Sequence, residues 1–161
     1  MFVHLAERPI ALCITDGVPR HDNDCMQLSA PKKPEFIRVK GAPAPRGPFS
    51  HAVRAGDFLF ISGQGPIDLA TDQFSFGDIA HETRLTLECV KYILDACGAS
   101  MEDVVKCSVF LTDPEDFAGM NAVYQQYFPN TAPARTTVQA GMVAKIMRVE
   151  IDCVAYVPAS L

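Results

Sequence analysis

The sequence predicts an α+β domain in which two helices pack on one face of a sheet. Two amphipathic helical segments are set among short strand-like segments, in the order β, β, β, α, β, α, β, β. Apolar residues make up 48% and charged residues 20% of the 161 residues, as in a globular protein that folds around one core. Both faces of the sheet carry apolar residues but the helices cover only one, so we expect self-association.

The first 34 residues show no sustained period and contain a polar run and a proline-rich stretch. We interpret residues 1–34 as a loosely ordered N-terminal extension and residues 35–161 as the domain. The first strand is expected at 35–40, followed by a proline- and glycine-rich loop over 41–48. Strands at 50–54 and 58–62 are joined by a hairpin turn at Ala55-Gly56-Asp57.

Asp78 is a candidate N-cap, with Glu82 in the first turn of a helix that Gly98 ends. The apolar stripe of this helix is predicted from spacings of three and four residues, and comprises Thr83, Leu87, Val90, Leu94 and Cys97. A strand at 104–111 should place Val105, Cys107, Val109 and Leu111 on one face. Asp113-Pro114 starts a second helix, to Phe128, with Phe117, Met120, Val123 or Tyr124, and Tyr127 facing inward.

The last two strands are predicted at 131–138 and 148–155. Joined as a hairpin through a loop at 141–144, they would place Arg135 directly opposite Glu150. Opposed residues share a face with Cβ atoms roughly 5 Å apart, so the guanidinium and the carboxylate would point the same way. Such pairs are most often partly solvated ion pairs worth roughly 0.2–1 kcal/mol. Alternatively, they can bind a small carboxylate and position a water molecule.

Composition bounds the function. The net charge of −5 argues against a protein that coats nucleic acid, which needs a basic footprint. No segment has the roughly 18–20 apolar residues that span a bilayer, and the N-terminus does not resemble a signal peptide, so we expect a cytoplasmic protein. The six cysteines form no C-x-x-C pair and no metal spacing, so we expect no metal. Cys89, Cys97, Cys107 and Cys153 are expected to be reduced thiols, and Cys13 and Cys25 are assigned no role.

Four motifs in order resemble the RidA/YjgF family of reactive-intermediate deaminases, over roughly residues 36–157. The first two are Gly47-Pro48-Phe49-Ser50-His51-Ala52-Val53 and Ile61-Ser62-Gly63-Gln64. The third is Phe117-Ala118-Gly119-Met120-Asn121-Ala122-Val123-Tyr124 with Phe128-Pro129. The fourth is Pro133-Ala134-Arg135-Thr136 with Val149-Glu150-Ile151-Asp152.

The resemblance implies a chorismate-mutase-like fold, a homotrimer with a ligand cleft at each subunit interface, and no cofactor. It also implies hydrolysis of 2-imino acids and their enamine tautomers, such as 2-iminobutanoate and 2-iminopropanoate, to 2-oxo acids and ammonia. Arg135 would hold the substrate carboxylate bidentately and Glu150 would activate a water. Its arginine neighbour should favour the ionised form of Glu150. The other expected substrate contacts are Phe49, Ser62, Gly63, Gln64, Asn121 and Thr137.

Two departures bear on substrate choice. Phe49 stands where relatives often have tyrosine, and Thr137 where they often have cysteine. These changes keep two alternatives open: an enamine deaminase of a catabolic pathway, of the 2-aminomuconate type, and a non-catalytic trimeric sensor of small carboxylates. The resemblance leaves a third, single-strand RNA cleavage, because some relatives carry that label. Acidic charge and the absence of paired histidines argue against RNA cleavage. His51 is expected to be a strand histidine without chemistry, His81 to be solvated, and Ser62 not to be a hydrolase nucleophile.

Overall fold

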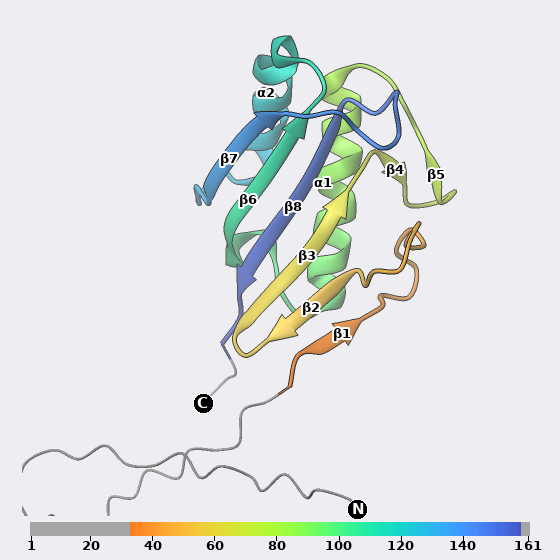
Figure 1. The fold of residues 1–161 in the computed structure, drawn as a ribbon. Helices are drawn as coiled ribbons and strands as arrows, with labels where there is room; N and C mark the ends of the chain where they lie inside the picture. Colours follow the sequence, from red (N-terminus) through yellow and green to blue (C-terminus); the bar gives the residue numbers. More distant parts are fainter. Residues whose placement is uncertain (1–32, 159–161) are drawn as a thin grey trace, which may run out of the picture. The chain divides into compact units, whose positions relative to one another are not determined.

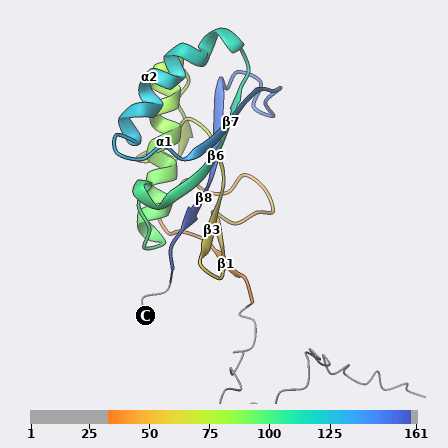
Figure 2. The same cartoon turned by 90° about the vertical axis from the view of Figure 1, so that its left-hand side faces the viewer.

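The computed structural model describes residues 33–158, and the predicted N-terminal extension lies almost entirely outside them. The described part is a mixed sheet with two helices on one of its faces, as Figures 1 and 2 show. The main sheet has the order β1-β2-β3-β8-β6-β7, with β4 and β5 forming a separate small hairpin. The predicted α+β class and the one-sided helices are confirmed. No helix in the described part is long and apolar enough to cross a membrane.

The strands largely follow the predicted positions. They are β1 (Glu35–Ile37), β2 (Ala52–Ala55), β3 (Phe58–Gln64), β4 (Ile67–Asp68), β5 (Gln73–Phe74), β6 (Val104–Leu111), β7 (Ala134–Gln139) and β8 (Val149–Tyr156). The hairpin β4–β5 was not predicted, because two-residue strands carry no period. Only three residues of the first predicted strand pair with β2, since the chain then leaves the sheet edge.

The helices form where capping and apolar spacing predict them. α1 (Ile79–Ala96) has Asp78 as its N-cap, whose carboxylate accepts a hydrogen bond from the His81 backbone N–H at 2.8 Å. A short helical turn η1 (Met101–Asp103) precedes β6, and η2 (Pro114–Asp116) leads into α2 (Phe117–Tyr127). Met120 and Val123 of α2 are buried as predicted. Phe117 is 45% exposed because it is the first residue of the helix.

The core lies between the helices and the inward residues of β3, β6 and β8. Its fully buried members include Leu59, Leu87, Ile93, Val109 and Ile151. The alternation predicted for β6 holds for Cys107, Val109 and Leu111. It fails at Val105, which is 44% exposed, because the pairing with β8 shifts register between Val104 and Lys106.

The predicted terminal hairpin is wrong. β7 pairs with β6 in parallel and β8 pairs with the other side of β6, so β6 separates the two strands that carry Arg135 and Glu150. Arg135 lies opposite Cys107, and Glu150 lies opposite Phe110. The cause is α2: a helix between two strands carries the chain back to the starting end of the sheet, so β7 enters parallel to β6.

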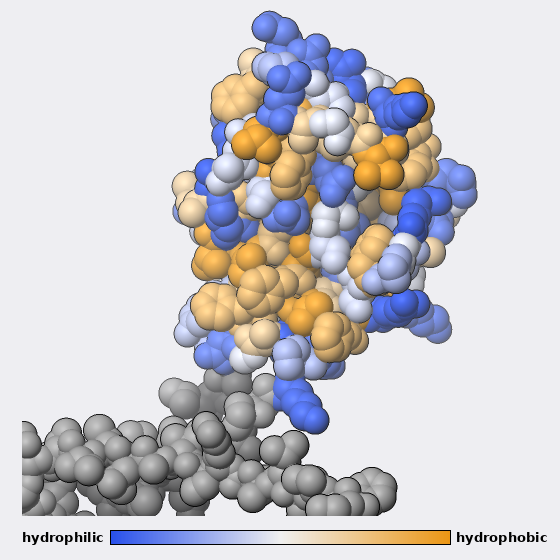
Figure 3. All heavy atoms as spheres, in the orientation of Figure 1, coloured by the Kyte–Doolittle hydropathy of each residue, from blue (hydrophilic) through white to orange (hydrophobic). Residues whose placement is uncertain are grey.

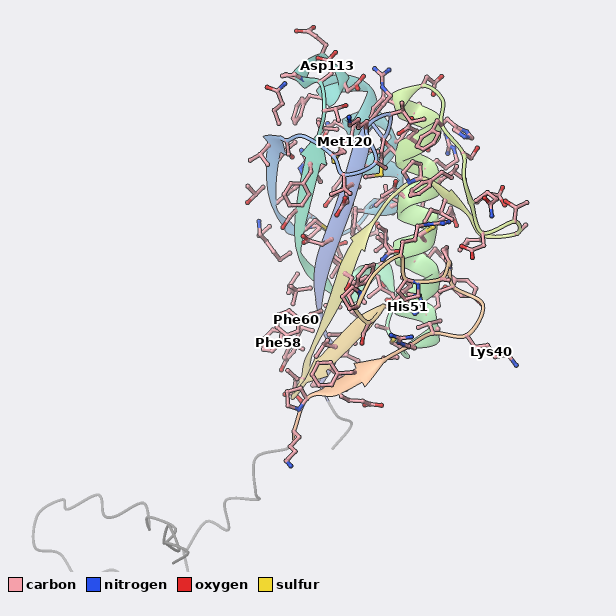
Figure 4. The ribbon with its side chains drawn as sticks, turned by 45° about the vertical axis from the view of Figure 1, so that its right-hand side comes forward. Lys40, His51, Phe58, Phe60, Asp113 and Met120 are labelled. Atoms are coloured by element: carbon pink, nitrogen blue, oxygen red, sulfur yellow. The ribbon has the colours of Figure 1, made fainter. Side chains whose placement is uncertain are left out.

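The face of the sheet that is turned away from the helices carries a group of exposed apolar side chains. Its side chains include Phe36, Phe58, Phe60, Val138 and Tyr156, each at least 43% exposed. Figure 3 shows apolar side chains gathered on this face, and Figure 4 places Phe58 and Phe60 on the side away from α1. These exposed apolar side chains are the feature of this face on which the expected self-association depends.

Candidate functional site

A cavity of about 390 Å³ lies where the end of β3 meets the loop before β2, the β4–β5 hairpin and the loop that enters β8. Fifteen residues line it: Pro43, Ala44, Pro45, Arg46, Phe49, His51, Gly63, Gln64, Gly65, Ile67, Phe74, Val143, Ala144, Met147 and Glu150. Four of the predicted site residues are therefore brought together here, namely Phe49, Gly63, Gln64 and Glu150. A pocket of this size suits a small organic ligand.

Glu150 contributes the carboxylate of this cavity. It points away from the helices, since its neighbours Val149 and Ile151 are fully buried on the helix side of β8. The register between β3 and β8 shifts between Ile61 and Gln64, with one additional residue in β3. Gly63 lies in this bulge, and a Cβ atom there would overlap the Glu150 carboxylate oxygen. The missing side chain of Gly63 thus makes room for the carboxylate.

Burial raises the pKa of Glu150 above its ordinary value of 4.5, and the nearby Asp152 carboxylate raises it further. Within one chain, the Arg135 guanidinium is not among the causes that act on this pKa. Arg135 lies on another strand and on the other face of the sheet, and among residues 33–158 no ion pair reaches the desolvated Glu150 carboxylate. A carboxylate whose pKa is raised towards neutrality is a better proton acceptor.

Arg135 lies on the helix side of β7. Its guanidinium carbon is 4.6 Å from the ring centroid of Tyr124 and 5.7 Å from that of Phe117, both on α2. The side chain is only partly buried, near the sheet edge that β7 forms. Arg135 is not among the residues that line the Glu150 cavity. Within one chain, Arg135 and Glu150, which the sequence suggested as a pair, therefore lie apart.

The remaining predicted contacts lie outside the cavity lining. Ser62 donates its hydroxyl hydrogen to the Ser50 carbonyl at 2.7 Å, which ties β3 to the start of β2. Asn121 is a half-buried residue of α2. Thr137 lies two residues after Arg135 on the same side of β7, and its buried hydroxyl has no hydrogen-bond partner in the described part of the chain. Asn121 and Thr137 thus belong with Arg135, on the elements β7 and α2.

His51 holds one wall of the cavity. Its Nδ1 accepts a hydrogen bond from the Val39 backbone N–H at 2.8 Å, so the ring hydrogen sits on Nε2, which donates to the Pro43 carbonyl at 2.8 Å. The side chain is buried, and Figure 4 shows it beside the loop before β2. The predicted role without chemistry is compatible with these two bonds, which fold the proline-rich loop over the cavity.

Two buried carboxylates fix the start of β8, two residues before Glu150. Glu82 of α1 is 1% exposed and accepts hydrogen bonds from the backbone N–H groups of Arg148, at 2.8 Å, and Gly77, at 3.2 Å. Asp116 accepts two bonds from the Arg148 guanidinium, at 2.9 and 2.6 Å. This network links both helices to the strand that carries the catalytic candidate.

Replacing Glu82 with alanine should therefore destabilise the domain by about 2–4 kcal/mol, because two backbone N–H groups lose their buried acceptor. Chemical denaturation of the variant and the wild type measures this difference. Glu102→Ala is the matched control, since Glu102 is exposed in η1. Equal unfolding midpoints for Glu82→Ala and the control would contradict a structural role for this network.

Sequence reasoning missed several residues of the cavity wall, including Arg46, Phe74 and Met147. They lie on loops and on the short hairpin, where no period or motif indicates which segments meet. The proline-rich loop was recognised only as a connection. Among residues 33–158 no cluster of three or more side chains is arranged to hold a metal ion.

Comparisons with known proteins agree with this fold. The model of the endoribonuclease L-PSP family matches residues 39–157. A RutC family protein of Pyrococcus horikoshii is 48% identical over 122 residues, which cover 76% of this chain and 97% of that protein. The 3-aminoacrylate deaminase RutC of Acinetobacter baylyi is 40% identical over 123 residues, 76% of this chain and 98% of the relative.

Among solved structures, RidA from an Antarctic Psychrobacter species superimposes with a TM-score of 0.72 at 36% identity. The superposition covers 76% of this chain and 99% of that one. The family match spans nearly all of the described domain, and the curated relatives are covered almost completely. The chain belongs to the RidA/YjgF family, whose sequence model carries the description endoribonuclease L-PSP.

Proposed function

We propose that this protein hydrolyses reactive 2-imino acids and their enamine tautomers to 2-oxo acids and ammonia. The observation that carries the proposal is the Glu150 carboxylate, half-buried in the cavity over Gly63, with its pKa raised by burial. Family membership supports the reaction class, because one relative is a 3-aminoacrylate deaminase and another is a RidA protein.

The chemistry needs a positioned water and one group that can accept a proton. A protonated C=N carbon is already electrophilic, so the protein has mainly to orient the water and stabilise developing charge. Glu150 would take a proton as the water oxygen bonds to the carbon, and return it to the nitrogen of the resulting carbinolamine. As the C–N bond breaks and ammonia leaves, Glu150 would accept the remaining hydroxyl proton, so that the neutral carbonyl of the 2-oxo acid forms. Phe49, Gly63 and Gln64 would lie against the bound substrate.

A second copy of the chain would supply the carboxylate anchor. Arg135 lies on the edge strand and on the opposite side of the sheet from Glu150. The guanidinium of one chain therefore does not reach the Glu150 cavity of the same chain. Packing of the apolar sheet face against neighbouring copies would bury Phe36, Phe58 and Phe60. We propose a homotrimer in which Arg135, with Asn121 and Thr137, borders the Glu150 cavity of the adjacent subunit.

The direct test generates 2-iminobutanoate or 2-iminopropanoate in situ with an amino-acid dehydratase. Semicarbazide reacts with the imine in competition with hydrolysis. Hydrolysis by the enzyme is therefore measured as a decrease in the rate of semicarbazone formation. The wild type should suppress semicarbazone formation in proportion to enzyme concentration. Tight binding of 2-oxobutanoate without turnover of any imine would refute the enzymatic function and indicate a carboxylate-binding protein instead.

Gly63→Ala separates folding from catalysis. The added methyl group meets the far end of the flexible Glu150 side chain, which can move aside, so stability should change by less than about 1 kcal/mol. The displaced carboxylate should lower kcat by about 10²-fold, since a misplacement near 1 Å has that effect. Thermal unfolding and the semicarbazide assay together check both. Gly56→Ala is not a suitable control, because Gly56 has a positive φ; Ala55→Gly on the same hairpin is a better one.

A further inference from the structure

Arg46 is the single lysine or arginine among the residues that line the Glu150 cavity. It comes from the proline-rich loop before β2, and its side chain is 46% exposed at the cavity wall. Nothing in the hydrolysis itself requires it, because the proposed carboxylate anchor is Arg135 of a neighbouring copy. Its charge is therefore available for another part of the ligand.

The guanidinium of Arg46 is held in place from two sides. Nη2 donates to the Asp72 carbonyl at 2.8 Å and lies 3.6 Å from the Asp72 carboxylate. The guanidinium carbon lies 4.7 Å from the ring centroid of Phe74. Asp72 also accepts the Ala44 backbone N–H at 3.2 Å, which joins the β4–β5 turn to the loop of Arg46. Nε and Nη1 of Arg46 make no hydrogen bond within residues 33–158, so donors remain for an anion.

The other walls offer an incoming anion little. Ile67, Phe74, Val143 and Met147 are apolar, and both ring nitrogens of His51 are already bonded to backbone groups. The Gln64 amide nitrogen donates to the Ser62 and Gly63 carbonyls. A cavity of about 390 Å³ also exceeds what a three-carbon imino acid fills, because pockets upwards of about 300 Å³ accommodate larger ligands.

We propose that Arg46 selects substrates with a second acid group on the side chain, that is, imino or enamine dicarboxylates. The inference rests on the proposed function. In it, Arg135 of the adjacent subunit holds the carboxylate beside the C=N bond, Glu150 handles the water, and Arg46 binds the distal carboxylate through its free donors. Planar guanidinium donors suit a carboxylate better than a lysine ammonium does.

Ligand binding tests the proposal without turnover. Calorimetry compares 2-oxoglutarate with 2-oxopentanoate, which share a chain length and differ in the distal acid group. The wild type should bind the dicarboxylate about tenfold or more tightly, as expected for a charge-assisted hydrogen bond. Arg46→Gln should remove this difference and leave 2-oxopentanoate affinity within about twofold. Lys145→Gln is the control, since this exposed residue lies outside the cavity lining.

Asp72→Asn should change the affinity for 2-oxoglutarate in the opposite direction to Arg46→Gln. It keeps the backbone carbonyl that holds Arg46, and asparagine tolerates the positive φ of 54° at this position. Removing the competing carboxylate should strengthen 2-oxoglutarate binding and leave 2-oxopentanoate unchanged. Arg46→Lys should retain part of the preference, because the charge stays while the planar fork is lost.

Three outcomes would overturn the role of Arg46. These are equal wild-type affinity for the two oxo acids, equal weakening of both by Arg46→Gln, or no response of either to that variant. Turnover distinguishes this failure from failure of the proposed function. If monocarboxylate and dicarboxylate imines are hydrolysed with equal kcat/KM, only the selectivity is refuted. If no imine of either kind is hydrolysed, the proposed function fails as well.

Discussion

Glu150→Gln is expected to lower kcat by about 10²–10⁴-fold while leaving the fold and the oligomeric state intact. This is the range in which a positioned proton acceptor contributes to catalysis. Glutamine keeps the shape of the side chain over Gly63 and removes only its basicity. The semicarbazide assay measures the loss. Glu102→Gln is the matched control, since Glu102 is an exposed glutamate of η1 that does not line the cavity. A Glu150→Gln variant with more than a tenth of wild-type kcat would refute the role of the carboxylate.

The pH profile should follow the same carboxyl group. Because burial raises the Glu150 pKa, wild-type kcat/KM should rise with pH through a value above the ordinary 4.5. Asp152→Asn removes the neighbouring charge that, together with burial, raises this pKa, so the acid limb of its pH profile should move to lower pH. An unchanged limb in Asp152→Asn would assign the titration to another group.

The raised pKa of Glu150 also predicts how ionisation of this side chain changes the stability of the folded protein. A carboxyl group whose folded pKa exceeds its unfolded pKa favours the folded state most below the unfolded value. That contribution is lost as pH rises through the folded value. At neutral pH the ionised Glu150 side chain therefore destabilises the folded state, and Glu150→Gln should unfold at a higher temperature than the wild type. A catalytic loss combined with a gain in stability separates chemistry from misfolding.

Arg135→Met should lower kcat/KM by about 10²-fold or more, mostly through KM. Truncating one partner of a hydrogen-bonded charge pair costs about 2–5 kcal/mol, and methionine still packs against Tyr124 and Phe117. Arg135→Lys should lie between, because it keeps the charge and loses the fork. Arg84→Gln, an exposed residue of α1, is the control. Unchanged KM for the imine in Arg135→Met would contradict the anchor.

How far the sequence leads depends on the kind of information each element carries. Asp78 and the spacing from Thr83 to Leu94 predict α1 correctly, because capping and amphipathic period are local. The alternation in β8 likewise predicts correctly that Val149, Ile151 and Cys153 face the core. Alternation does not name the neighbouring strand, so Arg135 and Glu150 were paired across a hairpin that does not form.

The candidate site shows the same division. The motifs predict Phe49, Gly63, Gln64 and Glu150, and the fold gathers these four around one cavity. Arg46 was missed because its partners, Asp72 and Phe74, belong to a hairpin that only tertiary packing forms. The placement of Arg135 on the far side of the sheet follows from the parallel entry of β7, which no local pattern encodes.

Mixing two inactive variants tests most directly whether the active site is shared between subunits. Glu150→Gln and Arg135→Met are refolded together in equal amounts, and each variant is refolded alone as a control. If the carboxylate comes from one subunit and the guanidinium from the next, about one quarter of the sites in randomly mixed rings contain both native residues. The account predicts recovery of about that fraction of wild-type kcat. If the mixture is no more active than the separate variants, although exchange of subunits is verified, the shared site is refuted.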